Sequence, residues 1–246
     1  MELLQTASVN GEDELAAIAA QGPEVICVCA FGQLIKEPLL SKYLLLNVHP
    51  SLLPRWRGAA PIERTLMAGD TTTGVTIFKL EEGLDSGPMA LSDSEPVQPD
   101  DTGGTLSARL APLGARLLVD SLDRAEAGTL ELTEQPEDGA TYAHKIEPGD
   151  RQLDPARPAV ELERIVRALT PHIGAQVTLP GGEPLRVWSS KVDSSEGEAP
   201  EPGELRAVDN RLLFGTSNGA LALVEVQPPG KRPMPAEAFL RGHSLQ

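Results

Sequence analysis

Three polar residues in the first half of the chain, Asn47, His49 and Asp85, have the types and spacing that acyl transfer requires. Asn47 and His49 stand two positions apart, so on a strand both side chains leave the same face. An imidazole exchanges protons near neutral pH, and a carboxamide donates to a carbonyl oxygen that gains negative charge. A carboxylate such as Asp85 orients the imidazole and stabilises its charged form. Together the three groups predict acyl transfer without a protein nucleophile.

The elements that would position these groups are two strands and a turn. Leu44–Val48 is a continuous apolar run, typical of a buried strand, and His49 follows it directly. Gly74–Leu80 is a further strand, and the turn Gly83–Gly87 after it carries Asp85. Because ligands bind at the carboxyl ends of strands in open α/β sheets, neighbouring strands would bring the groups together. An Asn-x-His at a strand end is also commonly structural, so the spacing alone leaves both interpretations open.

The rest of the first half alternates helices and strands, which predicts an α/β layer architecture. A strand over Val25–Ala30 is apolar throughout and is expected to be buried on both faces of a parallel sheet. The expected helices are Glu12–Gln21, Ile62–Ala68 and Thr105–Ala125. Pro112 lies within the longest of them and is expected to kink that helix or delay its start.

The character of the chain changes around residues 130–150, where polar stretches rich in turn residues predict a linker. A helix is expected over Ala159–Leu169. Short apolar segments separated by turn signals follow it and predict a small all-β barrel. These strands are 176–179, 185–188, 205–208, 212–214 and 221–226. We therefore expect a first domain over 1–130, a linker over 131–149 and a C-terminal barrel domain over 150–246.

Composition limits the partners of the chain. Residues 1–150 hold 24 acids and 10 bases, against 12 and 11 in residues 151–246. A polyanion would therefore be attracted by local basic patches and not by the long-range field, since the net charge is −15. Aromatic residues are only 3% of the chain, which disfavours an extended single-strand nucleic-acid platform.

The two cysteines, Cys27 and Cys29, have no Cys/His cluster near them in sequence. We expect both to be small core residues, and no metal site is predicted. Sparse cysteine, an opening without a basic leader and the lack of any apolar run of membrane-spanning length favour a cytoplasmic protein.

Other side chains with catalytic chemistry are less well placed. Ser51 lacks the glycine-flanked elbow that exposes the nucleophilic serine of many hydrolases. His144, His172 and His243 are scattered without ligand spacing, and we expect them at the surface.

The stretch Leu46–Ile62, LNVHPSLLPRWRGAAPI, closely resembles the hallmark segment of folate-dependent formyltransferases. Its RWRGAAPI part is most similar to the methionyl-tRNA formyltransferases of that family. Gly74–Ile77 and Gly83–Gly87 resemble the family's next two blocks. Gln227–Met234 and Phe239–Gly242 resemble the C-terminal domain of the tRNA enzymes, so the resemblance covers nearly the whole chain.

This resemblance implies a Rossmann-like catalytic domain followed by an open-barrel, OB-like C-terminal domain that binds tRNA. It implies 10-formyltetrahydrofolate as formyl donor and the α-amine of methionyl-initiator-tRNA as acceptor. Asn47 and His49 would polarise the formyl carbonyl and stabilise the tetrahedral intermediate, while Asp85 would keep the imidazole oriented and charged. We expect such an enzyme to need no metal and to be a monomer.

The resemblance also implies binding residues. Ser51, Leu52, Leu53 and Pro54 would lie along the folate. Phe31 and Gly32 belong to a segment, Cys29–Ile35, that is similar to the lining of the family's pterin pocket. Candidate tRNA contacts are basic residues near the site and near the end of the chain: Arg55, Arg57, Lys231, Arg232 and Arg241.

Two features depart from the family pattern. Family members carry roughly 60 further residues before the point that matches Met1, about half of a small domain. His172 stands where the family usually has an aromatic residue. Two other functions stay open beside the tRNA enzyme. An enzyme that formylates a sugar amine would use the same Asn, His and Asp groups, and the missing front part motivates a catalytically weak fragment that retains tRNA or folate binding.

Overall fold

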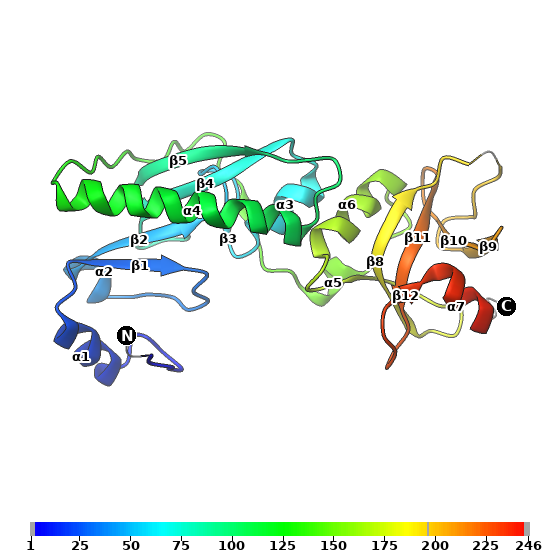
Figure 1. Cartoon of the computed structure of the whole chain (residues 1–246), viewed down its shortest axis with the longest axis horizontal. Coiled ribbons are helices and arrows are strands. Elements are labelled where there is room, and N and C mark those ends of the chain that lie inside the picture. The colour runs from blue at the N-terminus through cyan, green and yellow to red at the C-terminus, as the bar shows by residue number, and fades with distance from the viewer. Residues whose placement is uncertain (1–2, 196, 244–246) are drawn as a thin grey trace. The chain divides into compact units, whose positions relative to one another are not determined.

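The computed structural model of the chain describes residues 3–195 and 197–243 (Figure 1). The chain divides into two compact units. The first unit comprises Met1–Pro61, Thr72–Pro96 and Arg109–His144, and the second comprises Ile62–Thr71, Val97–Ala108 and Lys145–Gln246. The domain boundaries expected from the sequence, with a linker over 131–149, stay a prediction.

A four-stranded mixed sheet forms the centre of the first unit. Its strands are β1 (Val25–Cys29), β2 (Leu44–His49), β4 (Thr72–Lys79) and β5 (Met89–Pro96), in the order β1-β2-β4-β5. β1 and β2 are parallel, whereas β2–β4 and β4–β5 are antiparallel. The predicted strands are confirmed. β5 was not anticipated, because its second half is polar and exposed and carries little apolar signal.

The burial expected for β1 is wrong. Its residues are half-buried or exposed, and both Cys27 and Cys29 are exposed where core positions were expected. Among the described residues β1 pairs with β2 alone and lies at the edge of the sheet. The apolar composition of the strand therefore did not predict its burial. Although Cys27 is exposed, partial desolvation of its thiol raises the pKa of that group above the ordinary value.

Helix α4 (Gly103–Glu126) runs along the sheet (Figure 1). A Cβ atom at Gly114 would lie 2.8 Å from Val48 Cγ1, so the glycine lets the helix approach the strands closely. Leu106, Leu110 and Leu117 are buried, as the helical pattern predicts. α4 contains Pro112 but begins before Thr105, so the proline does not delay its start.

Shorter elements complete the first unit. They are α1 (Glu12–Gln21), α2 (Leu39–Lys42), and a two-stranded parallel ladder of β3 (Arg57–Gly58) and β6 (Tyr142–Ala143). The ladder was not anticipated, because two-residue strands carry no sequence pattern of their own.

The second unit is built on an antiparallel sheet that curls into an open half-barrel. Its path is β7-β8-β11-β10-β9, with β12 paired to β11. The strands are β7 (Ala175–Thr178), β8 (Pro184–Val192), β9 (Leu205–Val208), β10 (Arg211–Gly215), β11 (Ala220–Gln227) and β12 (Met234–Pro235). The five expected strands are confirmed.

Helix α6 (Ala159–Leu169) covers this sheet, with the bounds that the sequence predicts. It buries Leu162, Ile165, Val166 and Leu169, each of which contributes roughly 1.5–3 kcal/mol by leaving water. The other helices are α3 (Pro61–Ala68), α5 (Pro148–Arg151) and α7 (Ala236–Gly242). Within the part of the chain that is described, the helices are too short or too polar to span a lipid bilayer.

Candidate active site

His49 is the last residue of β2, and its side chain is almost fully buried. One ring nitrogen, Nε2, lies 2.9 Å from the backbone carbonyl oxygen of Trp56. The other, Nδ1, lies 3.6 Å from Oδ2 of Asp85. The structure therefore brings together two of the three residues that the sequence singles out, although they stand on different elements.

Asp85 is held from two directions. The backbone N–H of Gly58 donates to its Oδ2 at 2.8 Å. The Gln135 side-chain amide donates to the carbonyl oxygens of Asp85 and Gly87, each at 2.8 Å. Asp85 itself has φ 48°, a left-handed conformation that Asp tolerates better than most residues. The carboxylate is thus fixed before any substrate arrives.

Asn47 shares the face of β2 that carries His49, since the two are two residues apart on the strand. It is half-buried and lies opposite Phe78 of β4. Its carboxamide makes no hydrogen bond to any of the described residues. A half-buried amide that lacks a partner is suited to a carbonyl oxygen brought in by a substrate.

The environment of His49 favours a neutral ring at rest. Burial lowers its pKa, and the Asp85 carboxylate and the Trp56 carbonyl oppose this in part by favouring the protonated form. A carbonyl oxygen can only accept, so the neutral ring carries its proton on Nε2 and donates to Trp56. Nδ1 is then the basic nitrogen. A proton taken up there forms an imidazolium beside Asp85, at 3.6 Å.

The loop after His49 is fixed by its own polar groups. The Ser51 hydroxyl donates to the carbonyl of Arg55 at 2.6 Å, and the Thr76 hydroxyl donates to the carbonyl of Ser51 at 2.8 Å. Thr76 also accepts from the backbone N–H of Leu53 at 3.2 Å. Ser51 is completely buried, so its hydroxyl shapes the loop. Contact with a folate through Ser51, Leu52, Leu53 and Pro54 stays a prediction.

The ladder of β3 and β6 joins this loop to a distant segment. The backbone N–H of Arg57 donates to the Thr141 carbonyl at 2.9 Å, and that of Ala59 donates to the Ala143 carbonyl at 2.8 Å. Trp56 N–H donates to the Thr141 hydroxyl at 2.9 Å. The sequence interpretation missed these residues and Gln135, because their types are ordinary and they fall in the stretch expected to be a linker.

A side chain at Gly58 is expected to break this arrangement. Gly58 has φ 118°, and a Cβ atom there would lie 2.8 Å from the Ala143 carbonyl oxygen. We expect Gly58→Ala to lower the free energy of unfolding by about 1–3 kcal/mol and to lower activity, because the N–H that holds Asp85 moves. Thermal melting and a transferase assay measure the two effects.

Gly128→Ala is the matched control for backbone strain. Gly128 also has a positive φ of 69°, but nothing lies within 4 Å of its added Cβ atom. It should lose stability and keep its activity. Equal activities of the two variants would show that the ladder does not position Asp85.

The predicted pterin residues Phe31 and Gly32 follow β1 after one intervening residue, Ala30, and are exposed. β1 and β2 are parallel, with Cys29 opposite Val48, so both strands end at the same edge of the sheet. This places Phe31 and Gly32 on the edge where His49 lies. Their contact with a ligand stays a prediction.

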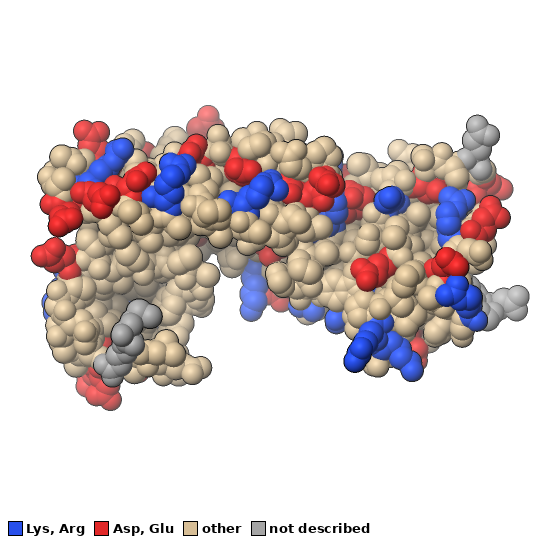
Figure 2. Space-filling view, viewed as in Figure 1, with Lys and Arg blue, Asp and Glu red and all other residues tan. Residues whose placement is uncertain are grey.

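The predicted tRNA contacts lie in both units. Arg55 stacks on the Trp56 ring at 4.4 Å from its centroid, and Arg57 Nε donates to Gln135 at 2.9 Å. In the second unit Lys231 and Arg232 are exposed between β11 and β12. Arg241 is exposed and pairs with Glu237 at 2.7 Å. Acidic side chains are spread over the visible surface of the first unit (Figure 2).

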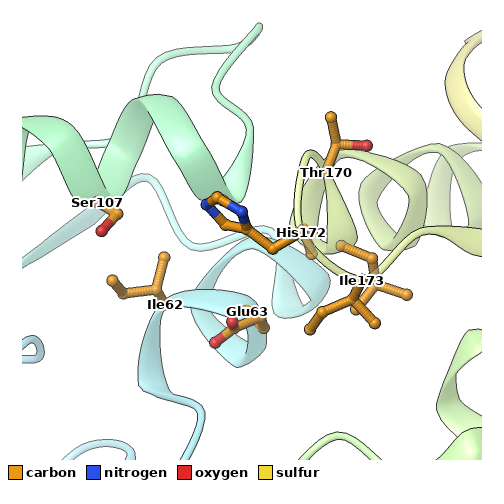
Figure 3. Close-up of a pocket in the computed structure, with 9 residues that line it drawn as sticks. Ile62, Glu63, Ser107, Thr170, His172 and Ile173 are labelled. Carbon is orange, nitrogen blue, oxygen red and sulfur yellow. The ribbon is translucent and has the colours of Figure 1, made fainter. Parts of the chain in front are cut away.

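Cavities of about 80 Å³ and about 230 Å³ lie in the second unit and contain none of the three catalytic candidates. His172 lines the smaller one, and its ring extends toward Ser107 (Figure 3). We propose that the active site lies at the strand edge, because His49 and Asp85 meet there. His144, His172 and His243 are exposed, as predicted. Among the described residues no cluster of His, Cys, Asp or Glu is arranged to hold a metal ion.

Residues 2–122 match the family described as formyl transferase, and residues 145–244 match the formyl transferase C-terminal domain. These two matches define the class of the chain as a formyl transferase. They also confirm the expected fold, a Rossmann-like domain followed by an open-barrel C-terminal domain.

The chain belongs to the methionyl-tRNA formyltransferase family. The methionyl-tRNA formyltransferase of Dechloromonas aromatica is 41% identical, over 100% of this chain and 78% of its own length. That of Methylococcus capsulatus is 42% identical, over 100% and 80%.

Solved structures share the fold at lower identity. HypX from Aquifex aeolicus in complex with tetrahydrofolic acid has a TM-score of 0.71 and 21% identity, over 94% of this chain and 41% of HypX. The methionyl-tRNA formyltransferase from Clostridium thermocellum has a TM-score of 0.62 and 17% identity, over 76% and 81%.

Proposed function

We propose that the chain transfers a formyl group from 10-formyltetrahydrofolate to the α-amine of methionyl-initiator-tRNA. The observation that carries this is the arrangement at the end of β2. There a buried imidazole lies 3.6 Å from a held carboxylate, on the strand face that also carries an amide without a partner among the described residues. The names of relatives that are 41% and 42% identical over the whole chain support the acceptor. The tetrahydrofolic acid bound by the structural relative HypX supports the donor.

Each side chain has a distinct role in this proposal. The Asn47 carboxamide donates to the formyl oxygen as the acceptor nitrogen bonds to the formyl carbon and negative charge develops. Nδ1 of His49 accepts the proton that this nitrogen loses, and Asp85 stabilises the imidazolium that results. As the bond between the formyl carbon and the folate nitrogen breaks, His49 returns the proton to that nitrogen.

The residues fit a formyl group without a metal. A Lewis acid would polarise the carbonyl oxygen in a metal enzyme, and here the Asn47 carboxamide is free for that oxygen among the described residues. We infer that the enzyme works without a metal, as a cytoplasmic monomer.

The alternative acceptor, a sugar amine, has weaker support. An N-formyltransferase from Helicobacter canadensis, solved with folinic acid and dTDP-3-aminofucose, is only 16% identical over 78% of this chain. This likeness shows a shared fold alone.

A transfer assay with two acceptors tests the proposal. The purified chain is given 10-formyltetrahydrofolate with either charged initiator tRNA or a dTDP-linked amino sugar. We expect formyl-methionyl-tRNA and no formylated sugar. Formylation of the sugar would show that the acceptor is a sugar amine and not the tRNA. Tight tRNA or folate binding without any transfer would favour the weak-fragment alternative.

The basic pair Lys231 and Arg232 is expected to bind tRNA phosphates. Removing both with Lys231→Ala and Arg232→Ala should weaken tRNA binding and flatten the slope of log affinity against log salt by about 1 per residue. Filter binding over a salt series measures this slope.

Arg116→Ala with Arg124→Ala is the charge-matched control. Both residues are exposed on α4 and their removal changes the net charge by the same amount. It should leave the slope unchanged. Equal slopes for the two double variants would remove Lys231 and Arg232 from the tRNA contacts.

A further inference from the structure

Strand β6 and the residue that follows it carry an exposed pair of aromatic rings. The rings of Tyr142 and His144 are stacked, with centroids 6.3 Å apart and an interplanar angle of 22°. Tyr142 is 50% exposed, and Ala143 between them is completely buried, so both rings leave the outer face of the strand. The Tyr142 hydroxyl makes no hydrogen bond to any residue that the structure describes. Neither burial nor hydrogen bonding explains a tyrosine at this position.

The pair lies beside the active site. In the parallel ladder Tyr142 is opposite Arg57, and opposite residues of a ladder point to the same face. Arg57 donates to Gln135, and Gln135 donates to the carbonyl of Asp85. The face of β6 that carries the rings is therefore the face that leads to the Asp85 turn.

Cationic side chains stand in the loop after His49, which pairs with β6 through β3. Arg55 lies over the Trp56 ring, and Arg57 follows directly. Aromatic faces beside arginines are the combination that binds single-stranded nucleic acid, because bases stack on the rings while cations meet the phosphates. Aromatic residues are 3% of the chain, too few for an extended platform, but one stacked pair is enough for one base.

We propose that Tyr142 and His144 form a stacking site for the terminal base of the acceptor's single-stranded 3′ end. This rests on the proposed function, in which the amine that reacts beside His49 is esterified to that same nucleotide. The terminal base must then lie within the length of one nucleotide from the reacting atoms. The exposed ring pair lies on the β3–β6 ladder, which is linked to the Asp85 turn through Gln135. Tyr142 acts as a positioning residue, because it holds the nucleotide and takes no part in bond making.

A fluorescence experiment tests the stack directly. Initiator tRNA that carries 2-aminopurine in place of its terminal adenine is titrated with the full chain, since 2-aminopurine emission falls when the base stacks. Wild type and Tyr142→Phe should quench the emission, whereas Tyr142→Ala should not. Loss of quenching in Tyr142→Phe, or full quenching in Tyr142→Ala, would overturn the proposal.

Steady-state kinetics supply the second measurement. In Tyr142→Ala, KM for charged tRNA should rise on the order of tenfold to a hundredfold, as loss of one stacked base predicts, while KM for the folate donor stays unchanged. Tyr142→Phe should keep the wild-type KM for charged tRNA, because phenylalanine retains the aromatic ring. His172→Ala, an exposed histidine of the second unit, is the control and should change neither constant.

Failure of this inference is distinct from failure of the proposed function. If wild type formylates tRNA and Tyr142→Ala does so with the same KM, the stacking site is wrong and the function stands. If wild type does not formylate tRNA, the function fails and the stacking site fails with it. Melting curves establish that Tyr142→Ala is folded, as expected for a half-exposed side chain.

Discussion

Replacement of His49 by alanine is expected to lower kcat by about 10²–10⁴-fold, the range for loss of a general acid–base group. KM for the folate donor should change little, because the ring faces Asp85 and the Trp56 carbonyl and is almost fully buried. Nδ1 is the nitrogen that accepts the proton lost by the attacking amine. Initial rates of tRNA formylation over a range of folate concentrations separate the two constants.

Folding must be checked for this variant, since alanine removes a buried ring and its hydrogen bond to Trp56. Circular dichroism and thermal melting identify a variant that is folded and inactive. His172→Ala serves as the matched histidine control because His172 is exposed and lies in the other unit. Full activity in His49→Ala would exclude the residue from the mechanism.

Replacement of Asp85 by asparagine is expected to act on both the rate and its pH dependence. The Asp85 charge raises the pKa of His49 and so opposes the lowering caused by burial. Without that charge the pKa falls further. The basic form of His49 then persists to lower pH, so the acid limb of kcat/KM shifts toward lower pH.

The plateau rate of Asp85→Asn should fall at the same time, by on the order of 10²-fold, because the imidazolium formed during transfer loses its counter-charge. Asparagine keeps an oxygen that can accept from Gly58, so the turn should stay in place. Rates measured from pH 5 to pH 9 test both effects. An unchanged acid limb together with a normal plateau would show that Asp85 does not act on His49.

Much of the fold follows from local pattern. The bounds of α6 follow from the helical periodicity of its apolar residues, and the barrel strands follow from apolar runs between turn residues. Asn47 and His49 could be placed on one face because side chains alternate along a strand. These features depend on residues close in sequence, where backbone geometry fixes which side chains neighbour each other.

Features that depend on distant pairing could not be predicted. Cys27 and Cys29 have the types of core residues, but their burial depends on what covers β1. The polar half of β5 becomes a strand because β4 pairs with it. Gln135 and Thr141 are ordinary in type, and their role appears only when they meet the loop around Trp56 and the Asp85 turn.

The ladder of β3 and β6 has a consequence for how this protein can be divided. Catalytic domains are commonly excised at a linker, and the sequence places a linker after residue 130. A cut there would keep Asn47, His49 and Asp85 and would discard Gln135, Thr141 and Ala143, whose hydrogen bonds fix the Asp85 turn and the loop. A shortened protein in which the Asp85 turn and the loop after His49 keep their positions must therefore extend at least through His144, which ends the first compact unit.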